Sequence, residues 1–338
     1  MHAFMTNKLW GDDRAVCITP VTQSESLLAF CHSRRDDMVA LLKDHGSLLM
    51  RGFAEATQNV TEEVVKCFCL DALDYVYGST PRKRITGKSF TTTEYPAALP
   101  IMLHTEMSYA RKWPRLLAFQ CITPPSTGGE TPIADMRGVS QRIGATLIEE
   151  FGRRGVCYVR NYGLGVDLDW TDAFQTTSKA VVNRIARDQD IRLDWISDSR
   201  LRSTQRCQGT IPDPFTGEHI WFNQSHLFHG SCLPSETRVG LEKMFAPEDL
   251  PRNATFGDGK PIPDKSMDAV RDAFWAEKKL FKWSAGDLLL VDNLQYAHGR
   301  MPFEGARLIA VAMGQEIEGL DVPARPKLSV FAKFFSRS

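Results

Sequence analysis

Two side chains in the first half of the sequence are suited to holding one metal ion. His104 and Glu106 stand two residues apart in ALPIMLHTEMSYA, a segment that we expect to be extended. Alternate side chains of an extended chain point to the same face, so this pair could chelate a metal. A second imidazole would complete the set of two histidines and one carboxylate that holds Fe(II) in non-haem oxygenases, with positions left open for co-substrate and oxygen.

His298 is the best candidate for the second imidazole. It follows the apolar stretch DLLLVDN at 287–293 and precedes RLIAVAMG at 307–314, a second strand candidate. This strand-turn-strand pattern would place His298 at the mouth of a barrel, where facing strands bring together residues that are distant in sequence. We therefore predict a metal site, and with it a catalytic centre, formed by His104, Glu106 and His298.

Arg307 indicates what else binds near the metal. Strand alternation puts every second residue from Arg307 to Met313 on one face, so the arginine shares an otherwise apolar interior face. A buried guanidinium needs an anion, and its planar fork suits the distal carboxylate of a dicarboxylic acid. A structural salt bridge is the alternative explanation for this residue.

The residues that could do chemistry lie in an ordered set of short motifs. H-x-E is followed by GGET at 128–131, by DN-x(4)-HGR at 292–300 and by G-x-R at 305–307. Over roughly residues 45–315, this order resembles the TauD/TfdA superfamily of Fe(II)/2-oxoglutarate-dependent dioxygenases. The nearer branch is that of the SyrP-like amino-acid hydroxylases of peptide natural-product pathways.

The resemblance implies a fold, cofactors and residue roles. The family fold is a double-stranded β-helix, a cupin-like jelly roll of mainly β structure with peripheral α-helices. The two histidines and the glutamate would hold Fe(II), and 2-oxoglutarate and O2 would be co-substrates. Thr131, at the end of the GGET motif, would hydrogen-bond 2-oxoglutarate, and Arg307 would pair with its far carboxylate. Arg300, in the turn after His298, is the alternative anchor, because the place where taurine-dioxygenase-type members carry a later arginine reads AVAMG here.

The identity of the carboxylate indicates which reaction to expect. Many TauD-like members have aspartate where this chain has Glu106, whereas glutamate is familiar among the amino-acid hydroxylases. Related halogenases lack the carboxylate so that a halide can bind iron, so we expect oxygen insertion. The expected reaction is hydroxylation of an unactivated C–H bond of an amino-acid-like small molecule, free or tethered to an acyl or peptidyl carrier protein, in natural-product (antibiotic) biosynthesis. Desaturation and epoxidation are alternatives within the same class.

Two other functions fit parts of the pattern. A cupin-like metal-binding or regulatory protein would share the barrel without turnover, but it has no need of Thr131 and Arg307 as a dicarboxylate site. A zinc hydrolase would use H-E-x-x-H or a cysteine cluster, and the sequence has neither. His226 and His229 would be ligands in a rival metal site, although their i, i+3 spacing is common among core histidines.

Polar residues in three segments are candidates for substrate contact. The loop PRKRITGK at 81–88 could close over the site and neutralise a substrate carboxylate, or meet an acidic carrier protein, although an ordinary solvated loop would look the same. Further candidates follow the metal pair directly or lie in IWFNQSHLFHG at 220–230. The candidates are Arg82, Arg84, Tyr109, Arg111, Asn223 and Gln224.

The elements that must position these residues are short strands with peripheral helices. Proline and glycine separate most of them, which favours a jelly roll or barrel over an alternating βαβ sheet. The expected helices cover 24–46, 61–76, 140–154, 172–188 and 265–280. The expected strands cover 47–53, 114–124, 130–136, 155–163, 287–293 and 307–314, with a hairpin over 211–223 and a long loop over 77–100.

Length and composition limit the remaining alternatives. With 338 residues, 43% of them hydrophobic, we expect a single domain over 1–338, with a helical N-terminal segment (1–46) and a jelly-roll core (about 47–315) that carries helical insertions. Lysine plus arginine and aspartate plus glutamate both number 41, so no global field favours nucleic acid or an anionic membrane. The start lacks a secretory signal, and no apolar run approaches the roughly 20 residues that span a bilayer. With eight scattered cysteines, these features predict a cytoplasmic protein with reduced thiols and leave its oligomeric state open.

Overall fold

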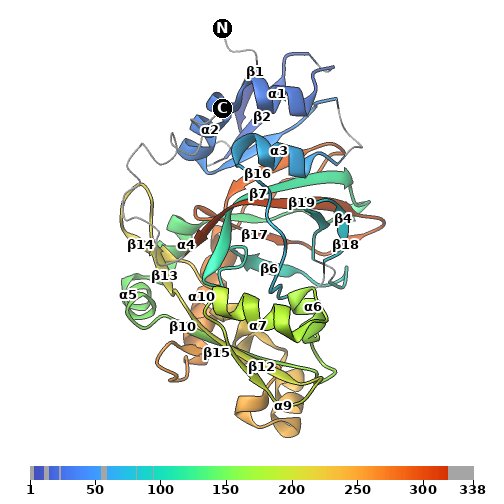
Figure 1. Cartoon of the computed structure of the whole chain (residues 1–338). Coiled ribbons are helices and arrows are strands. Elements are labelled where there is room, and N and C mark those ends of the chain that lie inside the picture. The colour runs from blue at the N-terminus through green and yellow to red at the C-terminus, as the bar shows by residue number, and fades with distance from the viewer. Residues whose placement is uncertain are drawn as a thin grey trace.

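An eight-stranded sheet forms the larger wall of the fold (Figure 1). The computed structural model describes residues 4–10, 15–22, 24–54, 59–80, 82–93 and 95–318. Neighbouring strands of the sheet are antiparallel except for the parallel pair β2 and β3. In spatial order the strands are β1 (Phe4–Lys8), β2 (Val16–Pro20), β3 (Ser47–Met50), β16 (Leu288–Asp292), β7 (Lys112–Thr123), β19 (Leu308–Glu318), β5 (Ser89–Thr91) and β4 (Arg84–Thr86).

A three-stranded sheet forms the opposite wall, below β7 and β19 in Figure 1. Side chains join the two walls, since the ring of Phe119 on β7 lies 4.9 Å from the ring of His298 on the small sheet. The strands of this wall are β6 (Ile101–His104), β17 (Tyr296–Arg300) and β9 (Ile133–Asp135), and nearby β18 (Phe303–Glu304) pairs with β8 (Thr127–Gly128).

Alternating apolar residues let the large sheet pack on both of its faces. On β19, Ile309, Val311 and Met313 belong to the core between the walls, whereas Ala312 packs into a second core with the N-terminal helices. These helices are α1 (Leu27–Ser33), α2 (Arg35–His45) and α3 (Thr61–Phe68). The shared face predicted for Ile309, Val311 and Met313 is confirmed, whereas Arg307 precedes β19 and a register shift between Leu308 and Ile309.

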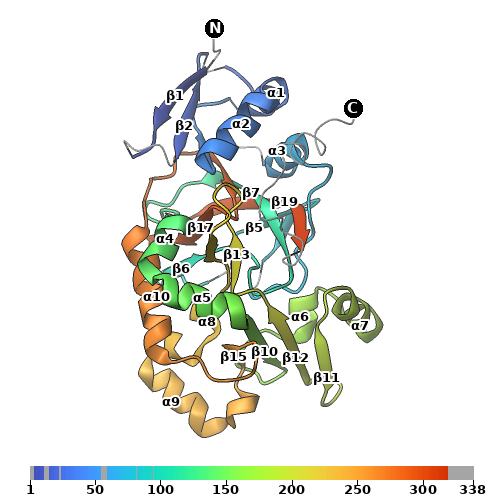
Figure 2. The ribbon, with the colours of Figure 1, turned by 90° about the vertical axis from the view of Figure 1, so that its left-hand side faces the viewer.

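A second antiparallel sheet lies beyond the small wall, in the lower part of Figures 1 and 2. Its strands are β11 (Arg192–Trp195), β12 (Leu201–Cys207), β10 (Val156–Tyr162) and β15 (Arg252–Phe256). The remaining elements are the hairpin β13 (Thr210–Pro212) and β14 (His219–Trp221), and the helices α4 (Met136–Ile143), α5 (Ala145–Arg154), α6 (Trp170–Phe174), α7 (Lys179–Asp188), α8 (Ser225–Phe228), α9 (Ser235–Met244) and α10 (Asp264–Glu277). Short 3-10 turns cover Gly230–Cys232 and Pro247–Asp249.

Several predicted helices are wrong in extent because the chain turns inside them. The segment 24–46 forms two helices that meet at Arg34, and 172–188 breaks at Gln175, which has a φ of 53°. The helix predicted over 140–154 is two helices, because Gly144 with a φ of 88° ends one and begins the next.

Two predicted boundaries fail because the chain pairs with the large sheet. The helix from residue 61 ends at Phe68, since Leu73 donates its N–H to the carbonyl O of Met313 on β19 (2.7 Å). The predicted loop 77–100 contains the hairpin β4 and β5, since Phe90 is buried and pairs with Val311. Both segments therefore pack beside the strand that follows Arg307.

The described residues test the predictions about the whole chain only in part. The single domain over 1–338 stays a prediction, and its residues 319–338 lie outside the described residues. Within the described ranges, no helix is long and apolar enough to cross a membrane.

Candidate metal centre

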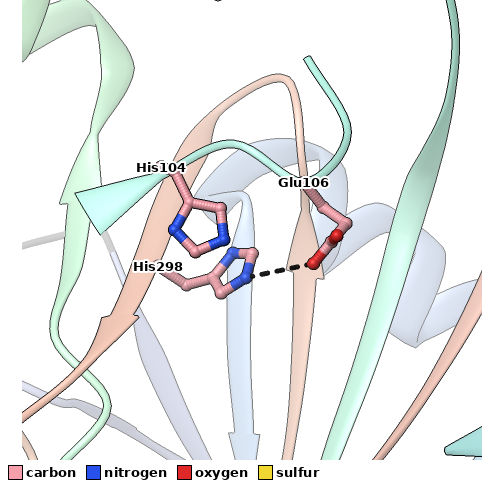
Figure 3. A group of neighbouring side chains, drawn as sticks. All are labelled: His104, Glu106 and His298. Atoms are coloured by element: carbon pink, nitrogen blue, oxygen red, sulfur yellow. Dashed lines mark ion pairs between the residues drawn. The ribbon is translucent and has the colours of Figure 1, made fainter. Parts of the chain in front are cut away.

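His104, Glu106 and His298 come together beside the small wall (Figure 3). His104 is the last residue of β6 and lies directly opposite His298 on β17. Their ring centroids are 4.6 Å apart, and Nε2 of His298 lies 3.5 Å from Oε2 of Glu106. One ligand atom from each residue lies within 4.8 Å of the others, and the described part of the chain holds no second such group of histidine, cysteine or acidic side chains.

The path of the chain to Glu106 differs from the expected one. The sequence predicts an extended segment with both side chains on one face, but β6 ends at His104 and Glu106 begins a turn. Met107 in this turn has a positive φ of 55°, a conformation that residues other than glycine rarely adopt. The carboxylate therefore reaches the histidines through a turn and not through strand alternation.

Asn293 holds this turn in place. Its Oδ1 accepts the N–H of Glu106 (2.6 Å), and its Nδ2 donates to the carbonyl oxygens of Glu106 (2.9 Å) and Pro114 (2.8 Å). Asn293 is buried and lies in the turn between β16 and β17, which carries His298. One short turn thus positions two of the three clustered side chains.

Protonation in the cluster suits a divalent metal. Nδ1 of His104 donates to the carbonyl O of Met102 (2.8 Å), which leaves Nε2 with its lone pair for a ligand. Burial, followed by the proximity of His298, lowers the pKa of His104 to about 4, so this ring is neutral near neutral pH. Burial alone would raise the pKa of Glu106, but Arg82 and His298 outweigh it and hold that pKa well below its usual range. A neutral imidazole, a carboxylate and a second imidazole fit Fe(II), for which this donor set is typical.

A small cavity beside the cluster collects the residues expected to bind the co-substrate. Thr131 and Arg307 line it together with His104 and His298. Trp283 donates its Nε1 to Oγ1 of Thr131 (3.0 Å), so the threonine hydroxyl keeps its own proton for a further acceptor. The lining residues are Arg82, Thr92, Thr93, Ile101, His104, Phe119, Thr131, His298, Gly299, Arg300 and Arg307.

Arg300 binds the backbone through both of its terminal nitrogens, whereas the contacts of Arg307 are longer. Arg300 donates from Nη1 and Nη2 to three carbonyl oxygens of the loop 95–99, at 2.6 to 2.9 Å. Arg307 makes longer contacts, from Nε to the carbonyl O of Gly129 (3.2 Å) and from Nη1 to Oγ1 of Thr92 (3.4 Å). Burial, followed by repulsion from Arg300, lowers the pKa of Arg307 to about 10, so its guanidinium stays charged near neutral pH. The geometry favours Arg307 as the carboxylate anchor.

Comparison with known proteins decides the family. A family model described as Taurine catabolism dioxygenase TauD, TfdA family matches residues 19–313. The chain belongs to the TauD/TfdA family. It is therefore an enzyme of the dioxygenase class, and the prediction from the order of its motifs is confirmed.

Relatives of the TauD/TfdA chain match it over most of its length. Dapdiamide synthesis protein DdaC of Enterobacter agglomerans is 37% identical over 314 residues, covering 92% of this chain and 94% of that protein. A clavaminate synthase-like protein of Arabidopsis thaliana is 31% identical over 288 residues, covering 81% and 83%. The structure of PvcB of Pseudomonas aeruginosa, described as an Fe, alpha-ketoglutarate dependent oxygenase, has a TM-score of 0.51 at 14% identity and covers 92% of this chain and 91% of that one. The predicted jelly roll with peripheral helices is confirmed.

One of the predicted substrate contacts, Arg82, lies beside the His104, Glu106 and His298 side chains. Arg82 donates from Nη2 to Oε2 of Glu106 (2.7 Å) and lines the cavity. Arg84 instead lies at the surface and pairs with Asp74 (2.9 Å), and Arg111 pairs with an exposed aspartate. Neither is among the described residues that line the cavity.

The other three candidates are buried and hydrogen-bonded within the protein. Tyr109 donates its hydroxyl to the carbonyl O of Tyr77 (3.0 Å), and Asn223 donates to a backbone carbonyl (2.6 Å). Gln224 donates to the carbonyl O of Thr105 (2.7 Å), and so supports the backbone between the two members of the H-x-E motif. These contacts are structural, and a substrate role for the three residues stays a prediction.

His226 and His229 form no rival metal site among the described residues. Nε2 of His226 donates to the carbonyl O of Leu103 (3.0 Å), and its ring stacks on Phe274 with centroids 4.7 Å apart. Nδ1 of His229 contacts the hydroxyl of Ser231 (2.9 Å). His226 therefore packs against β6, and His229 is held in the turn that follows α8.

Sequence patterns do not single out three residues of the site. Asn293 lies inside the DN-x(4)-HGR motif, so its place in the motif was a usable signal. Trp283 and Phe119 give no such signal, because aromatic residues in apolar segments are common in any core.

Proposed function

We propose that this TauD/TfdA family member is an Fe(II)- and 2-oxoglutarate-dependent hydroxylase of an amino acid or an amino-acid-like small molecule. One observation carries the proposal. The histidines of the His104, Glu106 and His298 cluster line the same cavity as Thr131 and Arg307. The cluster offers a metal the ligands of non-haem iron oxygenases, and the cavity offers a dicarboxylate a hydroxyl and a guanidinium. A non-catalytic metal-binding protein has no use for the second feature.

Each side chain has one task in this proposal. His104, Glu106 and His298 would hold Fe(II), which with 2-oxoglutarate and O2 supplies the oxidising power for breaking a C–H bond. Arg307 binds the far carboxylate of 2-oxoglutarate, and Thr131 donates a hydrogen bond to the same molecule. Because Glu106 occupies the carboxylate position, no place is left for a halide, and hydroxylation is favoured over halogenation.

Burial of Glu106 and His298 protects the reaction from water. Glu106 and His298 are 3% and 5% exposed, and the ring of Phe119 covers His298 at 4.9 Å. A site that excludes water strengthens electrostatic contacts and suppresses side reactions of an oxidised metal. The packing of the two walls thus supports an oxygenase.

The type of substrate is supported by Glu106 and by a relative. Glutamate in this position matches the amino-acid hydroxylases that the sequence resembles, and DdaC is a dapdiamide synthesis protein. We propose the same kind of biosynthetic role here, with an amino acid, free or bound to a carrier protein, as substrate. Desaturation and epoxidation would use the same residues, so the mass of the product decides among the three reactions.

Anaerobic reconstitution tests the proposal. Full-length protein with Fe(II) and 2-oxoglutarate should develop the visible absorption band of the Fe(II)–2-oxoglutarate chelate. Addition of O2 and a panel of free amino acids and small amines should then give succinate and a product heavier by one oxygen. A protein that shows neither the band nor succinate would instead be a non-catalytic metal-binding protein.

Metal replacement separates the proposal from a hydrolase. Zn(II) in place of Fe(II) should abolish succinate formation, because zinc has no redox chemistry. If the band and succinate form but no free amino acid gains oxygen, an aminoacyl carrier protein is the next probe. Activity that persists with zinc and without O2 would rule out the oxygenase.

A further inference from the structure

Arg82 is a buried cation beside the cluster of His104, Glu106 and His298. It uses only part of its hydrogen-bonding capacity. Its side chain is 4% exposed, and its guanidinium carbon lies 4.4 Å from the centre of the Tyr75 ring. Among the described residues, its one hydrogen bond runs from Nη2 to Oε2 of Glu106 (2.7 Å). Nε and Nη1 are buried and have no hydrogen-bond partner in the described part of the chain.

These two nitrogens carry three of the five N–H donors of an arginine. Burying a donor without an acceptor costs free energy, so each such donor in a native protein needs an explanation. Arg82 is also among the residues that line the cavity with His104 and His298. A small molecule in this cavity can therefore supply acceptors to Arg82.

The charges around the cavity show which kind of acceptor is missing. Its described lining includes three arginines, Arg82, Arg300 and Arg307, and no carboxylate, while Glu106 lies next to it. The arginines therefore give the cavity an excess of positive charge. In the function proposed above, the two positive charges of Fe(II) cancel the two negative charges of 2-oxoglutarate, so binding of both leaves this excess unchanged. Arg307 then pairs with 2-oxoglutarate and Glu106 with the metal, so Arg82 is left without a full counter-charge. A buried unpaired cation is costly, and a substrate anion would remove the cost.

Backbone groups of Ser79 and Lys83, near Arg82 in the chain, are hydrogen-bonded before any ligand arrives. The carbonyl O of Ser79 accepts a hydrogen bond from Nη2 of Arg252 (2.7 Å), and the N–H of Lys83 donates to Oγ1 of Thr91 (2.9 Å). A binding group that is held in place loses less entropy when its ligand binds. Arg84, two residues further on, points to the surface and has its own partner, Asp74.

We propose that Arg82 binds a free carboxylate of the substrate, so that the substrate is an untethered acid. The inference rests on the proposed function and narrows it. A planar guanidinium pairs well with a carboxylate, and its remaining bond to Glu106 ties the substrate acid to the metal cluster. An amino acid joined to a carrier protein through a thioester has no carboxylate at that end and would leave the donors of Arg82 unpaired.

Matched acid and amide probes test the proposal on the native chain. Full-length protein is loaded anaerobically with Mn(II) and saturating 2-oxoglutarate, which occupies Arg307, and is titrated with acetate, acetamide, glycine and glycinamide by calorimetry. Each acid should bind about ten- to a hundredfold more tightly than its amide, because a charged acceptor meets a charged donor. Equal binding of acid and amide, or binding of neither, would overturn the proposal.

Variants then locate the binding. Arg82→Gln should abolish the preference for acids, Arg82→Lys should keep part of it, and Arg84→Gln, the control two residues further along the chain, should leave it intact. An acid preference that survives in Arg82→Gln would assign it to another cation.

The chelate band separates this proposal from the proposed function. If the native protein forms the Fe(II)–2-oxoglutarate band but shows no acid preference, only the role of Arg82 fails. If the native protein forms no band, the proposed function itself fails.

Discussion

Asn293 binds the backbone of Glu106 on both sides, accepting its N–H at 2.6 Å and donating to its carbonyl O at 2.9 Å. The two residues are 187 positions apart, and Asn293 lies in the turn that leads into the strand of His298. One amide therefore joins the segment with the carboxylate to the segment with the distal histidine. Ligands that are held in place by such partners bind a metal more tightly.

Replacement of this amide should loosen the metal site. Asn293→Ala removes the hydrogen bonds to both backbone groups of Glu106, so the carboxylate loses its fixed position. We expect Mn(II) affinity to fall on the order of ten- to a hundredfold, as for other outer partners of metal ligands. Equilibrium titration with Mn(II), followed by electron paramagnetic resonance of the free ion, measures the change.

Asn223→Ala is the matched control, because Asn223 is also buried and donates to a backbone carbonyl (2.6 Å), that of Gly209. Both variants should lower the free energy of unfolding, by about 1 to 3 kcal/mol, since each leaves buried backbone groups unpaired. Only Asn293→Ala should weaken metal binding. Equal metal affinity in the two variants would show that Asn293 contributes to the fold alone.

Glu106→Gln should affect the protein even before metal is added. The amide keeps the size of the side chain but removes the charge that balances Arg82, whose side chain is 4% exposed. Loss of one partner from a buried ion pair costs about 3 kcal/mol of unfolding free energy. Urea denaturation of the metal-free protein measures this, and metal titration should show nearly complete loss of binding.

Glu62→Gln provides the comparison for that variant. Glu62 also pairs with a cation, Lys66, at 2.7 Å; Glu62 is 13% exposed, but the lysine is 46% exposed, so solvent reaches this pair. Because solvent screens surface pairs, Glu62→Gln should change the unfolding free energy little. If both variants unfold at the same urea concentration as the native chain, the Arg82 pair is weaker than its burial indicates.

The sequence patterns predicted the strands of the site better than its turns. The segments 114–124, 287–293 and 307–314 are apolar enough to be recognised, and they appear as β7, β16 and β19. The alternation along β19 was also readable, because one face packs between the walls and the other under the helices. Helix breaks such as that at Gly144 were not predicted, since the apolar pattern continues across them.

The three residues His104, Glu106 and His298 were predictable from the sequence, whereas the contacts that position them were not. The H-x-E pattern suggested a strand through alternation, but β6 ends at His104 and Glu106 lies in the turn that follows it. That turn depends on Asn293, a contact that local spacing cannot reveal. The pairing of Arg82 with Glu106 also depends on tertiary structure, because a basic loop looks solvated in the sequence.

Substitution of Arg307 should lower the affinity for 2-oxoglutarate much more than substitution of Arg300. Arg307→Ala removes the favoured anchor, and we expect the affinity for 2-oxoglutarate to fall on the order of a hundredfold, because a buried charge pair loses one partner. Arg300→Ala should instead loosen the loop 95–99, whose carbonyls it binds, with a much smaller effect on 2-oxoglutarate. Anaerobic titration of the chelate band gives both affinities. A loss confined to Arg300→Ala would make Arg300 the anchor.

Thr131→Val should weaken 2-oxoglutarate binding, and Trp283→Phe tests whether the hydroxyl or the indole is responsible. The hydroxyl of Thr131 accepts the indole N–H of Trp283 (3.0 Å), so valine removes both a donor to the co-substrate and the acceptor of Trp283. We expect an affinity for 2-oxoglutarate about tenfold lower, which corresponds to one hydrogen bond to a charged group. Trp283→Phe keeps the threonine hydroxyl and should leave the affinity near that of the native chain. If titration of the chelate band shows the loss in Trp283→Phe and not in Thr131→Val, the indole and not the hydroxyl determines co-substrate binding.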